Sequence, residues 1–361
     1  MNRLSMRAAL LGFVVAAGLV AAAPAPAGPP DNRYTVTPLV SDVPGRAPVT
    51  DANVQNAWGL ARSATSPWWI VDNGTDMTSI YTGAGALVQI GGINAQGVPG
   101  APTGAVFSGI GGQFQVGTTA APTTLGTSNF IFDAEDGTIS AWRGGSTAAL
   151  VTKDLSPMGA SFKGLAISNG PSGPRLYAAD FANGVVDVFD GGWNLRNTPG
   201  AFVDANLPAG FAPFGIQTIG SRVFVTYAIQ GAEGDEIDRP AAGIVDAYDL
   251  DGVFVGRVAS HGLLNAPWGL AQAPADWGAA QDDLLVGNFG DGRINAFRED
   301  APGDFTYDGT LRGEDGKKLS IDGLWALEFG NAGSNGTPDQ LFFTAGPEDE
   351  SHGLFGTITA G

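Results

Sequence analysis

The sequence contains no cysteine, so no disulfide can brace the fold, and a large hydrophobic core must supply its stability. Basic residues are scarce as well: 18 Lys and Arg stand against 36 Asp and Glu, which gives a formal net charge of −18. A surface of that sign repels phosphate groups, so we expect neither nucleic acid nor anionic lipid as a partner. Small cationic molecules and metal ions are compatible with it.

Long hydrophobic runs are absent beyond the N-terminus. The one apolar run, Leu10–Ala23, follows two arginines and precedes the small-x-small sequence Ala25–Ala27. It is shorter than the roughly 20 residues that a membrane-spanning helix needs. We therefore predict that residues 1–27 are a cleaved signal peptide and that the protein is secreted or extracytoplasmic, with no membrane span; an uncleaved anchor is the alternative. Residues 28–361 are predicted to form one domain.

Helical periodicity is also lacking after the leader. The chain has 55 Gly and 23 Pro, and its apolar runs are mostly four to six residues long, separated by turn residues. Short strands joined by tight turns are typical of an all-β protein. Tight turns are predicted at Asp136-Gly137, Asn183-Gly184 and Asp291-Gly292, because Gly and Asn tolerate a positive φ angle.

An internal repeat organises the chain. A short apolar strand, usually with Gly at its second position, occurs six times, with spacings of 45, 60, 51, 54 and 57 residues. The copies are Trp58-Gly59-Leu60-Ala61, Thr103-Gly104-Ala105-Val106, Lys163-Gly164-Leu165-Ala166, Phe214-Gly215-Ile216-Gln217, Trp268-Gly269-Leu270-Ala271 and Trp325-Ala326-Leu327-Glu328. A second strand follows each copy, and a third strand follows most of them.

These repeats predict an all-β fold, a six-bladed β-propeller of four-stranded antiparallel blades. The recurring glycine suits an innermost strand, where blades crowd around the axis. The last copy shows only three strands, and the strand Tyr34–Val40 precedes the first copy. We predict that this N-terminal strand closes the ring in the last blade. A seven-bladed ring would need a seventh copy.

The pattern of Leu176–Asp190 resembles the repeats of NHL-type six-bladed propellers. Residues 266–297 and 346–358 are similar to an uncharacterised family of secreted bacterial β-propeller proteins. NHL-like neighbours include calcium-dependent gluconolactonases and propeller lyases, so the resemblance implies a site at the axial opening. Gluconolactonases place several oxygen ligands at the first residue of the repeated strand, where this sequence has no carboxylate or carboxamide.

Strand polarity indicates which end of the ring could carry a site. Neighbouring strands in a blade are antiparallel, so the first strand begins at the rim where the second strand ends. We call this the start rim and the opposite one the end rim. The acidic loops 233–238 and 348–352 and both histidines, His261 and His352, are predicted to lie on the start rim.

The candidate site residues all belong to the start rim. Candidate ligand-binding aromatics, which could instead be packing residues, are Trp58, Trp268, Trp325 and Phe214. Candidate metal ligands are Asn73, Glu135, Asp180 and Asn288. Their oxygen atoms suit calcium, but these side chains could instead form hydrogen bonds within their own turns. Candidate catalytic residues are Lys163 and His352; Lys163 could instead form a structural ion pair with Glu135 or Asp180.

The function predicted from these features is that of a secreted, monomeric propeller that binds a small molecule or an extracellular partner at the start rim. The alternative is a metal-assisted, calcium-type hydrolase such as a lactonase, or a lyase. A structural envelope protein is a third possibility. The common hydrolase motifs and the nucleotide-binding loop are absent from the sequence.

Overall fold

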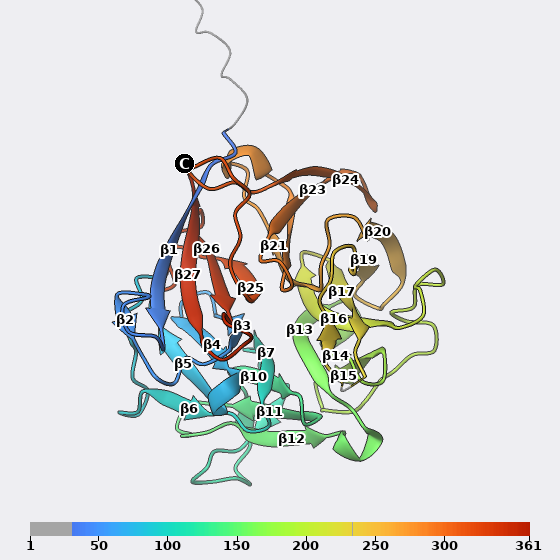
Figure 1. The fold of residues 1–361 in the computed structure, drawn as a ribbon. Coiled ribbons are helices and arrows are strands. Elements are labelled where there is room, and N and C mark those ends of the chain that lie inside the picture. The colour runs from blue at the N-terminus through green and yellow to red at the C-terminus, as the bar shows by residue number, and fades with distance from the viewer. Residues whose placement is uncertain (1–30, 233) are drawn as a thin grey trace, which may run out of the picture. The chain divides into compact units, whose positions relative to one another are not determined.

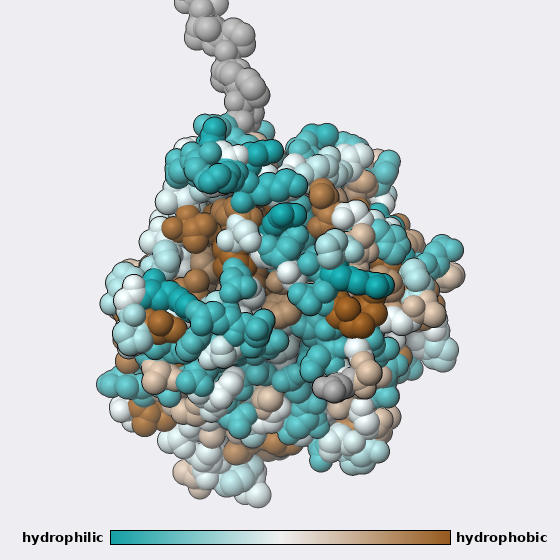
Figure 2. Space-filling model, viewed as in Figure 1, coloured by the Kyte–Doolittle hydropathy of each residue, from teal (hydrophilic) through white to brown (hydrophobic). Residues whose placement is uncertain are grey.

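The computed structural model describes residues 31–232 and 234–361, and the predicted signal peptide lies outside them. Most strands of this part form six small sheets arranged around a common centre (Figure 1). This confirms the all-β, six-bladed propeller. No helix within the described residues is long and apolar enough to cross a membrane. The face in Figure 2 is mostly hydrophilic, with hydrophobic residues in separate spots.

The blades follow chain order, and the strands of each are given from the axis outward. Blade 1 contains β3 (Ala57–Ala61), β4 (Trp68–Asp72), β5 (Met77–Tyr81) and β6 (Ala95–Gly97). Blade 2 contains β7 (Pro102–Phe107), β10 (Phe130–Ala134), β11 (Thr138–Trp142) and β12 (Leu150–Asp154). Blade 3 contains β13 (Phe162–Gly170), β14 (Gly173–Asp180) and β15 (Val185–Asp190).

The second half of the ring is built in the same way. Blade 4 contains β16 (Phe211–Ile219), β17 (Arg222–Gln230), β19 (Ile244–Asp249) and β20 (Phe254–Ser260), with the short β18 (Glu236–Ile237) on β17. Blade 5 contains β21 (Pro267–Gln272), β22 (Leu284–Asn288), β23 (Ile294–Ala301) and β24 (Asp304–Thr310). Blade 6 contains β25 (Leu324–Phe329), β26 (Leu341–Ala345), β27 (Leu354–Ala360), β1 (Tyr34–Ser41) and β2 (Val49–Thr50).

Short elements occupy the connections. The strands β8 (Gln115–Val116) and β9 (Gly126–Thr127) pair in the connection between β7 and β10. The single-turn 3-10 helices are η1 (Asn73–Thr75), η2 (Ser156–Met158) and η3 (Gly278–Ala280).

The two ends of the described chain close the ring in blade 6, as predicted. Strand β1 pairs antiparallel with β27, with Val36 opposite Ile358, and β2 adds a short parallel pair outside β1. The C-terminus therefore lies beside the start of β1 (Figure 1).

Blade 3 departs from the predicted four strands. After β15 the chain turns back, and the backbone N–H of Arg196 donates to the carbonyl of Val188 (2.6 Å). The N–H of Val188 donates to the side-chain oxygen of Asn197 (2.9 Å). A side chain thus replaces part of the backbone ladder that a fourth strand would form.

The inner strands β3, β7, β13, β16, β21 and β25 contact one another in this order around the ring. The recurring glycine permits that approach. An ideal Cβ on Gly59 would lie 2.4 Å from the carbonyl oxygen of Thr103, and one on Gly215 would lie 2.2 Å from that of Trp268. Both distances are shorter than atomic contact allows, so these positions require glycine, as predicted for an innermost strand.

Candidate functional site

The register of the inner two strands decides which side chains meet at the start rim. The first residue of the inner strand pairs with Asp72 in blade 1, Asp180 in blade 3 and Asn288 in blade 5. The residue after each of these partners makes the contacts between blades. Around the ring these following residues are Asn73, Glu135, Phe181, Ala228, Phe289 and Gly346. Successive residues of a strand point to opposite sides. Asn73 and Glu135 are therefore among the residues that make contacts between blades, whereas the pairing residues Asp180 and Asn288 point the other way.

Aromatic side chains close the channel below this rim. We call Trp58, Phe181, Phe214, Trp268, Phe289 and Trp325 the aromatic plug. Trp58 stacks on Trp325 with ring centroids 3.7 Å apart, and Phe289 stacks on Trp325 at 4.1 Å. Phe214 and Trp268 meet the edge or face of Trp325 at 5.9 and 6.0 Å. The four predicted aromatics are thus brought together, and they pack on one another.

The polar atoms of the plug are only partly satisfied. The indole N–H of Trp268 donates to the carbonyl of Lys163 (2.6 Å), and that of Trp325 donates to Oδ1 of Asn56 (2.9 Å). The indole nitrogen of Trp58 is buried and has no hydrogen-bond partner among the described residues. A buried N–H without an acceptor is unfavourable.

Lys163 lies directly against the plug. Its Nζ is 5.2 Å from the centroid of the Trp58 ring, and its side chain is only 2% exposed. The same atom is 2.5 Å from Oε1 of Glu135 and 3.3 Å from Oδ1 of Asp235. The predicted pair of Lys163 with Glu135 is confirmed.

Amides extend this network toward blade 6. The side-chain amide of Asn73 donates to Oε2 of Glu135 (3.0 Å). That of Asn56 donates both to Oδ1 of Asn73 (3.2 Å) and to Oε2 of Glu350 (2.6 Å). We call Glu135, Asp235, Glu236 and Glu350 the carboxylate cluster, because all four interact electrostatically with Lys163.

Burial shapes the charge of the cluster. It raises the pKa of Glu236 to about 7, although the ammonium of Lys163 opposes this. It also raises the pKa of Glu350, against the hydrogen bond from Asn56 and the charge of Lys163. For Lys163 burial alone would lower the pKa, but the nearby carboxylates, chiefly Glu135 and Glu236, outweigh it and raise the pKa. When all are ionised, four carboxylates face one ammonium, so the site is strongly negative.

The loop that carries Glu350 has an uncommon backbone. Three consecutive non-glycine residues, Glu348, Asp349 and Glu350, have φ angles of 59, 52 and 62°. Left-handed helical conformation costs about 1–2 kcal/mol per residue. Hydrogen bonds from the N–H of Glu348 to Oδ2 of Asp322 (2.9 Å) and from the N–H of Glu350 to the carbonyl of Gly346 (3.1 Å) hold the turn. Strain of this kind concentrates at binding and active sites.

His352 lies on the same loop but has other partners. Its Nδ1 is 2.7 Å from Oδ2 of Asp42, and its Nε2 is 3.6 Å from Oε2 of Glu348. The other histidine, His261, contacts the carbonyl of Ala241 through Nδ1 (3.0 Å). Neither histidine contacts Lys163 within the described residues.

Asp180 and Asn288 lie outside the cluster. The carboxylate of Asp180 accepts hydrogen bonds from the N–H of Ser161 (3.2 Å) and from the N–H and side chain of Asn183 (3.1 and 2.7 Å). The amide of Asn288 donates to the carbonyl of Leu263 (2.8 Å). The four predicted metal ligands therefore do not surround one point, and as placed they do not fit a shared calcium site. No three His, Asp or Glu side chains in residues 31–232 and 234–361 are grouped to hold a metal.

Four contributors were not predicted individually: Asn56, Asp235, Glu236 and Glu350. Glu236 and Glu350 come from the two acidic loops that strand polarity assigns to this rim, but their direction depends on loop backbone. Asn56 immediately precedes β3 and has a positive φ of 43°, which asparagine tolerates.

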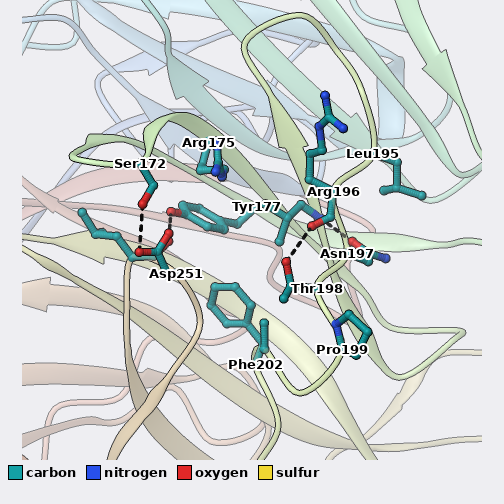
Figure 3. Close-up of a pocket in the computed structure, with 13 residues that line it drawn as sticks. Ser172, Arg175, Tyr177, Leu195, Arg196, Asn197, Thr198, Pro199, Phe202 and Asp251 are labelled. Carbon is teal, nitrogen blue, oxygen red and sulfur yellow. Dashed lines mark hydrogen bonds between the residues drawn. The ribbon is translucent and has the colours of Figure 1, made fainter.

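A groove of about 690 Å³ lies away from the axis, beside the incomplete blade 3 (Figure 3). Its polar groups mostly bind one another. The hydroxyl of Tyr177 donates to the carbonyl of Leu250 (2.7 Å), and Ser172 donates to Asp251 (2.9 Å). The axial cluster is therefore the better candidate for a site.

Two viral proteins are similar to this chain over most of its length, and no protein-family model matches the sequence. The "Uncharacterized protein R648" of Acanthamoeba polyphaga mimivirus is 30% identical over 341 residues, covering 91% of this chain and 80% of the viral protein. The "Uncharacterized protein L690" of the same virus is 30% identical over 339 residues, covering 90% and 85%. This chain belongs to the same family as these viral proteins. Because these relatives are viral, the bacterial and secreted character of the predicted resemblance stays a prediction.

Several solved structures are similar to this chain. A protein of unknown function from Bacteroides thetaiotaomicron matches 90% of this chain and 76% of its own, with a TM-score of 0.53 and 9% identity. A streptogramin B lyase matches 91% of this chain and 98% of its own chain, with a TM-score of 0.47 and 12% identity. A gluconolactonase from Xanthomonas campestris matches 69% of this chain and 86% of its own chain, with a TM-score of 0.39 and 18% identity. Such low identities concern the fold alone and carry no information on the site.

Proposed function

We propose that this protein binds a small organic cation at the start rim, between the carboxylate cluster and the aromatic plug. The observation that carries the proposal is the setting of Lys163, a buried ammonium that lies over Trp58 and among four carboxylates. One positive charge does not balance four carboxylates, and a bound cation would reduce the excess of negative charge.

The chemistry of the walls favours an organic cation over a bare metal ion. Aromatic faces attract ammonium groups by about 0.5–2 kcal/mol, and the half-buried ring of Phe289, which stacks on Trp325, is such a face at the start rim. The partly exposed Glu135 and the exposed Asp235 leave a path from solvent, with side chains 28% and 76% exposed. The strained turn that presents Glu350 supports a binding role as well.

Binding of a cation should be linked to proton release. Burial raises the pKa of Glu236 to about 7, so this group is partly protonated at neutral pH. A bound cation favours the ionised form. Affinity should therefore rise as the pH increases through about 7.

The experiment uses choline as the probe and 3,3-dimethylbutan-1-ol as its neutral isostere, both titrated into the full chain by calorimetry. Choline should bind, more tightly at pH 8 than at pH 6, and the alcohol should not. Glu350→Gln and Glu236→Gln should each weaken choline binding by about tenfold, the loss of roughly one charge interaction of 1.4 kcal/mol. Asp339→Asn, on an exposed loop residue, is the matched control. Equal binding of choline and the alcohol would count against the proposal.

We further propose that residues 1–27 are removed on export, so that a small-molecule site would face the outside of the cell. Intact-mass analysis of the mature protein should show a start near Gly28. Retention of Met1 would contradict the export leader without affecting the binding proposal.

A further inference from the structure

The free space of the channel lies at the end rim, opposite the carboxylate cluster. A cavity of about 300 Å³ opens there, and a smaller one adjoins it and reaches Trp268 of the plug. Leu60, Ala105, Gln217 and Glu328, from four different inner strands, line both cavities. Because the plug fills the start-rim side, a ligand could enter this space only from the end rim.

One ion pair sets the charge of the cavity. Nε of Arg62 lies 3.3 Å from Oε1 of Glu328, and Nε and Nη2 donate to the carbonyl of Phe329 (3.0 and 2.6 Å). The guanidinium carbon of Arg62 is 5.3 Å from the ring centroid of Trp68, which fixes the side chain further. With Glu328 ionised, the pair is neutral overall. Burial, opposed by Arg62, raises the pKa of Glu328 to about 7.

Several polar atoms of the wall lack partners. The hydroxyl oxygen of Thr218 and Oδ1 of Asn331 are buried and make no hydrogen bond within residues 31–232 and 234–361. Each such atom costs about 1–3 kcal/mol when left unpaired. Ser63 and Gln217 are further polar residues of the wall, and the remaining ones are aliphatic or aromatic, including Val106, Phe107 and Ile167. An apolar enclosure with a few convergent polar groups is typical of small-molecule pockets.

We infer that the end-rim cavity is a second ligand site, which binds a small neutral molecule with an apolar body and a hydroxyl group. A hydroxyl can donate to the partly exposed Glu328 carboxylate, and it can pair with Thr218 or Asn331 once a side-chain rotation turns their buried oxygens toward the cavity. A cationic ligand would compete with Arg62 for a single carboxylate, and an anionic ligand would face Glu328; both would be desolvated without a free partner. The site is independent of the proposed cation site at the start rim.

The test uses three probes with one body and different charge: 2-phenylethanol, 2-phenylethylammonium and phenylacetate. Their binding to the full chain is measured by ligand-observed NMR titration. The alcohol should bind at least tenfold more tightly than either ion. Thr218→Val, which removes the hydroxyl and keeps the shape, should weaken the alcohol several-fold.

Ala105→Leu fills the cavity and should abolish binding of the alcohol. Thermal melting of each variant shows whether it is folded. If Ala105→Leu does not fold, Thr218→Val remains as the test variant. Glu350→Gln, at the opposite rim, should leave alcohol binding unchanged, so failure here and failure of the choline experiment are distinguishable. The inference is overturned if the folded wild-type protein does not bind the alcohol, if the three probes bind equally, or if binding survives in folded Ala105→Leu.

Discussion

The ammonium nitrogen of Lys163 lies over the indole ring of Trp58, 5.2 Å from its centroid. This contact joins the two parts of the start-rim site, the aromatic plug and the carboxylate cluster. A cation over an aromatic face is stabilised by about 0.5–2 kcal/mol, more when water is excluded. Lys163 thus offsets the charge of the carboxylates, and its contact with the Trp58 ring stabilises the ammonium in that position.

Removing this charge should destabilise the fold in a pH-dependent way. In Lys163→Met the carboxylates lose their counter-charge, so the pKa values of Glu236 and Glu350, already raised by burial, rise further and the ionised forms of these groups become costly. The loss should be about 2–4 kcal/mol at pH 8, because one partner of a buried pair is left alone. It should shrink as the pH falls and the carboxyls are protonated.

The measurement is urea unfolding of wild type and variant at pH 5 and pH 8. The matched control is Lys317→Met, which removes an exposed partner of Asp315 (side chains 84% and 57% exposed) and should cost less than about 0.5 kcal/mol. A loss that is the same at both pH values would show that packing, not charge, dominates at Lys163.

Asp133 should make stability fall as the pH rises. Its carboxyl is fully buried; Oδ1 accepts from the N–H of Gly104 (2.6 Å) and the hydroxyl of Thr103 (3.1 Å). Burial raises its pKa from 3.8 to about 7, despite these hydrogen bonds. The folded state therefore holds the proton more tightly than the unfolded state, and stability is lost as the pH rises from about 4 to about 7.

Asp133→Asn keeps an acceptor at Oδ1 and removes the titration. Between pH 5 and pH 8 the wild type should lose about 2.5 kcal/mol more unfolding free energy than this variant. Denaturant unfolding at both pH values measures the difference. Parallel pH dependence in the two proteins would mean that Asp133 is ionised throughout in the folded state.

The fold follows from the sequence because the repeat is local and periodic. Each inner strand starts with the same short pattern, and strand polarity alone assigns Lys163 and Glu135 to one rim. Blade 3 could not be predicted in the same way. Its fourth strand is replaced by a turn in which the side chain of Asn197 binds the edge of β15. The repeat in the sequence does not predict that a turn takes the place of this strand.

The site could be predicted only in part, because a shift of one residue reverses the direction of a side chain. Asn73 and Glu135 stand one place after the pairing residue and join the cluster, whereas Asp180 is the pairing residue itself and does not. Only the register of strand pairing distinguishes these cases. Glu236, in the short strand β18, and Glu350, in a turn, lie outside the repeated strands, so the repeat does not predict their direction.

The glycines of the inner strands should differ in their tolerance of alanine. A Cβ at Gly215 would lie 2.2 Å from the carbonyl oxygen of Trp268, whereas one at Gly164 would lie 3.0 Å from that of Phe214. Gly215→Ala must move the neighbouring blade and should cost about 2–3 kcal/mol; Gly164→Ala should cost less than about 1 kcal/mol. Chemical denaturation of the two variants gives the comparison, and equal costs would show that the blades adjust freely.

The predicted calcium site is tested at Asp180. Its carboxylate serves Ser161 and Asn183, so Asp180→Ala should remove the acceptor of a tight turn and lower stability by about 1–2 kcal/mol. The loss should be the same in calcium, in magnesium and in chelator, because these residues do not surround a common point with Asn73 and Glu135. The measurement is thermal melting of wild type and variant in each condition. A metal that binds only the folded state raises the melting temperature. If calcium raised that of the wild type, and Asp180→Ala abolished the shift, the metal-assisted hydrolase or lyase would replace the organic-cation site as the better account of the start rim.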